Sequence, residues 1–124
     1  MEAWELDFEW LKVRHFVKER FGKTDLPDLN VILLLIGIQE LGRIKTSRFT
    51  KEEKTDLLHV ASCVLLSFDG YYELRGKDQD GWPHYHMLKP FSLKGVKEQE
   101  SYLKEKVIQY FKLEFPTEFI QHAS

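Results

Sequence analysis

The sequence predicts a mainly α-helical fold in one domain, residues 1–124: a compact four-helix bundle with a small β-hairpin or extended loop between helices three and four. Two observations support this prediction. Apolar residues recur every three or four positions over four long segments, and residues typical of helix ends bound these segments. Residues 71–88 are instead rich in tyrosine, glycine, aspartate and proline, the composition of short strands and turns.

The first helix is expected from about Asp7 to Phe21. Asp7 is suited to be its N-cap, and Gly22 follows the last apolar residue, as a C′ glycine does. The apolar positions of this segment form two wide, aromatic-rich faces rather than one stripe. This pattern indicates that the helix is covered on more than one side.

The second helix is expected from Pro27 to Leu41, with Pro27 in its first turn and Gly42 closing it. Nearly every residue from Asn30 to Ile38 is apolar, so this part of the helix has no polar face that would be expected to contact water. A helix that is apolar all round lies at the centre of a fold or meets another chain. Helix 27–41 is therefore the predicted surface of a homodimer.

The third helix has the clearest start signal, because Thr50–Glu53 fits a capping box and the apolar stripe then continues to Asp69–Gly70. The fourth helix is expected over about Gly95–Leu113, and Pro116 stops it. Residues 116–124 are predicted to form a short tail. No internal repeat or linker interrupts this order, and a chain of this length usually holds one core.

Charge and composition limit the classes of partner. The net charge of −2 argues against general nucleic-acid binding, which depends on neutralising phosphates. One basic segment, between the second and third helices, offers a candidate anion site at Arg43, Lys45 and Arg48; the alternative is an ordinary solvated basic loop. The single cysteine, Cys63, has apolar neighbours and is expected to be a buried structural thiol.

The sequence contains no predicted membrane segment. The first ten residues, MEAWELDFEW, are acidic and aromatic, the reverse of a signal peptide. The longest apolar run, Val31–Ile38, is far shorter than the roughly 20 residues that cross a bilayer. With one free thiol and no export signal, the chain is expected in the cytoplasm.

The loop Gly76–Leu88, GKDQDGWPHYHML, is the best candidate for a functional site. His84 and His86 are two apart, so on a strand they point to the same face and could hold a divalent metal with Asp80 or Glu73. An EF-hand does not fit, because its first and last positions would fall on Gly76 and a methionine instead of carboxylates. Ordinary polar strand residues are the alternative to a metal site.

Aromatic residues give the loop a second interpretation. Trp82 and Tyr85, with Tyr72 nearby, combine apolar area with a polar group, which is typical of protein contact sites. The alternative is that Trp82 folds back onto the core. No Gly-x-Ser-x-Gly, Walker A or Gly-x-Gly-x-x-Gly motif occurs, and no catalytic residue or bound cofactor is predicted.

The pair Asp56 and His59 has the spacing of half of a di-iron carboxylate site, but the second acid-x-x-His sequence is missing, so a helix-surface pair is expected. The leading hypothesis is therefore a small, non-enzymatic interaction module that contacts its partner through Gly76–Leu88. The alternative is a metal-binding protein or a metal-dependent enzyme that uses His84 and His86.

Overall fold

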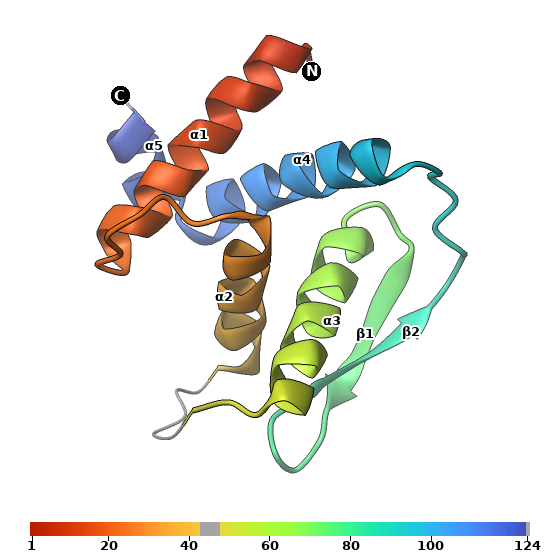
Figure 1. Cartoon of the computed structure of the whole chain (residues 1–124). Coiled ribbons are helices and arrows are strands. Elements are labelled where there is room, and N and C mark those ends of the chain that lie inside the picture. The colour runs from red at the N-terminus through yellow and green to blue at the C-terminus, as the bar shows by residue number, and fades with distance from the viewer. Residues whose placement is uncertain (43–47, 124) are drawn as a thin grey trace. The chain divides into compact units, whose positions relative to one another are not determined.

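The computed structural model describes residues 1–42 and 48–123, with side chains described up to Phe119. These residues form five helices and one two-stranded antiparallel sheet (Figure 1). In chain order the elements are α1 (Ala3–Arg20), α2 (Leu29–Leu41), α3 (Lys51–Ser67), β1 (Tyr72–Lys77), β2 (Pro83–Met87), α4 (Val96–Glu114) and α5 (Pro116–Ala123). The prediction of a mainly helical fold with a hairpin before the last long helix is confirmed.

The chain divides into two compact units. Residues 1–32 and 93–124 form the first unit, which contains α1, the first turn of α2, α4 and α5. Residues 33–92 form the second, which contains the rest of α2, α3 and the hairpin. The single domain and the four-helix bundle stay predictions.

Helix α1 starts earlier than the sequence analysis placed it, so the assignment of Asp7 as its N-cap is wrong. Glu2 is the N-cap, and its backbone N–H donates to Oε1 of Glu5 at 3.3 Å. Glutamate three residues into a helix commonly caps it in this way, although Glu2 is not a usual N-cap residue. The predicted end is confirmed: Phe21 is the C-cap, and Gly22 follows with φ +63°.

Phenylalanine rings form the core of the first unit. The ring centroid of Phe16 lies 5.8 Å from that of Phe111, 5.5 Å from that of Phe115 and 5.6 Å from that of Phe119. Phe119 belongs to α5 and is buried, so residues 116–123 of the predicted short tail form a helix that packs on this core. Pro116 stops α4, but it also occupies the first position of α5, where the missing N–H of proline costs no hydrogen bond.

Helix α2 begins at Leu29 rather than at Pro27, because the Oδ1 atom of Asp28 accepts from the N–H of Val31 at 3.0 Å and caps the helix. Further along, α2 passes close to α3 at Gly37. A Cβ atom at this position would overlap the backbone carbonyl of Leu57, so only glycine fits there. This close approach fixes α2 against α3 within the second unit.

Helix α3 has the predicted capping box. The N–H of Thr50 donates to Oε1 of Glu53 at 2.8 Å, and the N–H of Glu53 donates to Oγ1 of Thr50 at 3.1 Å. The helix ends at Ser67, two residues before the predicted boundary. Figure 1 shows the hairpin lying along α3, which supplies the packing that an isolated pair of strands lacks.

The predicted hairpin is confirmed, and it lies within the expected range 71–88. Tyr72 pairs with Met87, and Leu74 pairs with Tyr85. A β-bulge between Leu74 and Gly76 inserts one extra residue into β1 and shifts the register towards the turn. Residues 78–82 therefore form the turn and stand next to the first half of α3.

Candidate functional site: a cleft between α3 and the hairpin turn

A cleft of about 410 Å³ lies between α3 and the hairpin turn, wholly within residues 33–92. It combines carboxylates, imidazoles and aromatic rings from two segments of the chain. Its lining residues are Asp56, His59 and Val60 of α3, Asp78 and Trp82 of the turn, and Pro83, His84 and Tyr85 of β2.

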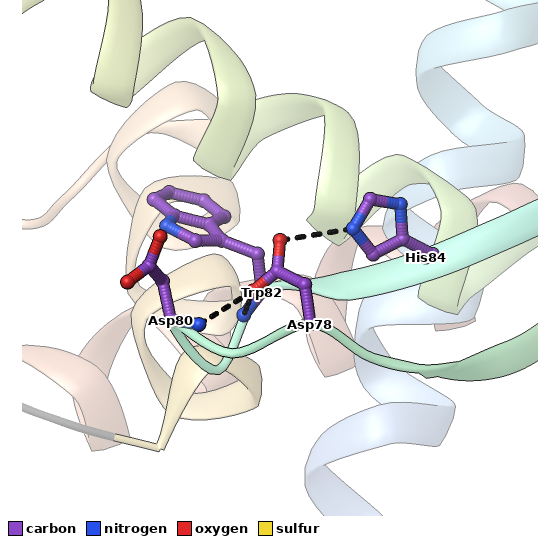
Figure 2. A network of polar contacts seen from close by, with 4 residues as sticks. All are labelled: Asp78, Asp80, Trp82 and His84. Atoms are coloured by element: carbon purple, nitrogen blue, oxygen red, sulfur yellow. Dashed lines mark hydrogen bonds and ion pairs between the residues drawn. The ribbon is translucent and has the colours of Figure 1, made fainter.

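The carboxylate of Asp78 organises the turn (Figure 2). Its Oδ1 atom accepts from the backbone N–H of Asp80 at 2.9 Å and from that of Trp82 at 3.0 Å. Its Oδ2 atom lies 3.0 Å from Nε2 of His84. An aspartate that accepts from backbone amides two and four residues ahead holds a turn in one conformation.

These contacts also set the charge of Asp78. The hydrogen bond from His84, followed by that from the backbone of Trp82, holds the pKa of the Asp78 carboxyl below its usual value of 3.8. Asp78 is therefore ionised at neutral pH, and both of its oxygens have hydrogen-bond partners. Asp80 was predicted only as a metal ligand, and the aspartate that organises the turn is Asp78.

Trp82 and Tyr85 line the cleft, and both are half-buried. Trp82 therefore lies between the two predicted alternatives: it is neither fully buried in the core nor fully exposed on the surface. Burial raises the pKa of Tyr85 to about 12, with a smaller contribution from the Glu40 carboxylate, so its phenol stays protonated. Tyr72 lies at the far end of the hairpin opposite Met87, away from the turn.

The two histidines of β2, His84 and His86, have different neighbours. His84 lines the cleft next to Asp78, whereas His86 is opposite Glu73 in the hairpin register. Figure 2 shows the carboxylate of Asp80 directed away from His84. In the part of the chain that the structure describes, no three side chains of His, Cys, Asp or Glu are grouped to hold a metal ion. The metal site stays a prediction.

Asp56 and His59 are exposed on α3, as expected, but both line the cleft. Nε2 of His59 lies 3.6 Å from Sγ of Cys63. The thiol is buried, and burial raises the pKa of Cys63 to about 11, so it is a neutral structural thiol rather than a nucleophile. The acid-x-x-His spacing was the only sequence signal for these two cleft residues.

The candidate anion site is described only in part. Arg43 and Lys45 lie outside the described residues, and Arg48 is exposed.

Over residues 1–42 and 48–123, no helix has the length and apolar character needed to cross a bilayer. Comparison of the chain with protein-family models, curated proteins and solved structures finds no match. The chemistry of the cleft therefore carries the functional argument.

Proposed function

We propose that this protein is a small binding module whose cleft takes a cationic side chain, arginine or lysine, from a partner protein. The observation that carries the proposal is the ionised Asp78, which holds the backbone of Trp82 in a cleft that a second carboxylate, Asp56, also lines. A non-enzymatic role in the cytoplasm is part of the same proposal.

Preorganisation supports a binding role. A turn held by its own hydrogen bonds loses little conformational entropy when a partner docks. Asp78 holds the backbone at Trp82 in place before any partner arrives. Tryptophan and tyrosine are also the side chains that most often dominate the energy of protein contacts.

Charge and ring chemistry support a cationic ligand. Two carboxylates, those of Asp56 and Asp78, line the cleft together with the rings of Trp82 and Tyr85. A guanidinium or ammonium group binds over the face of an aromatic ring, most strongly over tryptophan, while it is attracted to a nearby carboxylate. Asp78 already accepts three hydrogen bonds within the hairpin, so Asp56 is the carboxylate more available to meet the ligand directly.

The test is a titration of the isotope-labelled protein with N-acetyl-arginine methylamide, followed by the NMR signal of the Trp82 indole N–H. The control ligand is the citrulline analogue, which has nearly the same shape and no charge. We expect saturable shifts at Trp82 with the arginine probe and little change with the neutral one. Equal shifts with both probes would contradict a cation site.

Matched variants then identify the carboxylate. Asp56→Asn should weaken binding of the arginine probe about tenfold, the effect expected for one charge-assisted contact. Glu52→Gln, which changes another exposed acid of α3 outside the cleft, should leave binding unchanged. Trp82→Ala should abolish binding while the hairpin stays folded. Binding that survives both Asp56→Asn and Trp82→Ala would exclude the cleft.

A metal site is the second candidate, and one observation favours it. Glu73 and His86 are directly opposite in the hairpin, and His84, two residues before His86, shares its strand face. Such a site would use these three side chains, with Asp80 as the alternative acid, and it would need them to move closer together, because they are not grouped for a metal in the described part of the chain. It has less support than the cation site, because His84 is already paired with Asp78.

A further inference from the structure

Helix α1 has one covered face and one uncovered face. On the covered face, Val13 and Val17 are fully buried. On the other face, Trp4 is 68% exposed, Phe8 is 57% exposed and Leu11 is 42% exposed. We name Trp4, Phe8 and Leu11 the α1 stripe. The two apolar faces expected from the sequence are thus present, but only one of them is packed.

The spacing of the α1 stripe is that of a helix–helix contact. Its members are separated by four and then three residues, so they lie on one side of the helix and form a narrow apolar seam. Isolated exposed apolar residues are common, but a continuous row that includes two aromatic rings marks an interaction surface.

Charge along α1 identifies what covers the stripe. The acidic residues Glu2, Glu5, Asp7 and Glu9 lie in its first half. The basic residues Lys12, Arg14, Lys18 and Arg20 lie in its second half, with Glu19 as the one exception. A second α1 placed antiparallel sets each acidic half beside a basic half, whereas a parallel one sets like halves together.

We infer that the α1 stripe is the contact surface of a homodimer in which two copies of α1 pack antiparallel about a twofold axis. Such an axis makes the same patch bind itself. Centred between Phe8 and Leu11, it packs Phe8 of each copy on Leu11 of the partner subunit. This surface is separate from the cleft, so neither proposal depends on the other.

The exposed fractions of the apolar side chains favour the α1 stripe as the dimer surface over helix 27–41, which was predicted from the sequence. The apolar side chains of α2 are all buried or half-buried, whereas those of the α1 stripe are exposed. Three of the four basic residues of α1 already have contacts within the chain: Lys12 is paired with Glu9 at 3.0 Å, Arg14 donates to the carbonyl of Pro27 at 2.8 Å, and Arg20 is paired with Glu118. The orientation of the pair therefore depends chiefly on Asp7 in the acidic half and Lys18 in the basic half, and the apolar stripe supplies most of the affinity.

The first test is sedimentation velocity of the intact protein from about 1 µM to about 1 mM, the range expected for a small interface. We expect a monomer–dimer equilibrium that Phe8→Ser weakens at least about tenfold. Trp4→Ser should act in the same way, and thermal melting of both variants reports whether they remain folded. Leu113→Ser, at an equally exposed position of α4, should leave the equilibrium unchanged.

The second test measures orientation. A spin label at Glu19→Cys, in a Cys63→Ala background, should give a distance between labels of about 30 Å in the antiparallel dimer, from the rise per helical residue. A parallel pair would give about 10 Å and would overturn the inference. So would a protein that stays monomeric throughout, or a dimer that persists in the Trp4→Ser and Phe8→Ser double variant.

Discussion

The core of the first unit and the hairpin turn are both rich in aromatic residues, but they use them differently. In the core, Phe16 contacts three other phenylalanine rings and is buried. In the turn, the backbone of Trp82 is held by a carboxylate, and its ring lines a cleft. The comparison teaches that aromatic content alone does not show whether a ring is packed in a core or lines a cleft, whereas polar anchoring and partial exposure distinguish the two regions here.

The largest expected effect is on the core side of this comparison. Phe16→Ala removes a buried ring and should lower the free energy of unfolding by about 3–5 kcal/mol, measured by urea denaturation. The control is Leu113→Ala on α4, an exposed position where the change should stay within about 0.5 kcal/mol. Similar losses at the two positions would remove the distinction between packed and exposed apolar residues.

A smaller, local effect is expected at the turn. Asp78→Ala removes the acceptor for two backbone amides, so the amide of Trp82 should exchange with solvent faster while global unfolding changes little. The matched control is Asp80→Ala, which keeps the Asp80 backbone N–H and should preserve protection at Trp82.

Protection of the Trp82 amide from exchange with solvent should depend on pH in one direction. The pKa of Asp78 is lowered in the folded protein, so its contribution is present above the usual value of 3.8 and is lost as the pH falls through the folded pKa. Protection at Trp82 should therefore persist below pH 3.8 and disappear at more acidic pH. Loss of protection well above that value would mean that Asp78 does not hold the turn.

The smallest effect is spectroscopic. One of the five tyrosines, Tyr85, should ionise at about pH 12 because burial raises its pKa from the usual 10. Its contribution to stability is thus present below pH 10 and lost as the pH rises towards about 12. An ultraviolet titration should show this late step, and Tyr85→Phe should remove it. Five tyrosines that ionise together near pH 10 would contradict the burial of Tyr85.

The sequence predicted best the features that depend on neighbouring residues. The capping box at Thr50 and Glu53 involves only one helical turn, and its spacing alone specifies it. Helix α5 was missed because Pro116 both stops one helix and starts another, and only packing of Phe119 against Phe16 decides between a tail and a helix. The start of α1 was missed because Glu2, which is not a usual N-cap residue, caps the helix in place of the expected Asp7.

The part of the candidate site that was predicted also consists of residues that are neighbours in the sequence. Trp82, Tyr85 and His84 were found because they are close together in sequence. Asp56 and His59 enter the cleft only because the hairpin folds back along α3, and no local pattern encodes that return. The role of Asp78 in the turn was not predicted, because backbone hydrogen bonds, rather than residue type, decide which aspartate holds the turn.

The division of the chain has a consequence for the order in which the protein folds during synthesis. The second unit is a single continuous stretch, residues 33–92, so its contacts can form as soon as that stretch has left the ribosome. The first unit joins residues 1–32 to residues 93–124, so α1 cannot pack on α4 and α5 until these last helices are made. Until then the aromatic face of α1 around Phe16 is uncovered, which makes the nascent chain most vulnerable to aggregation at its N-terminal helix.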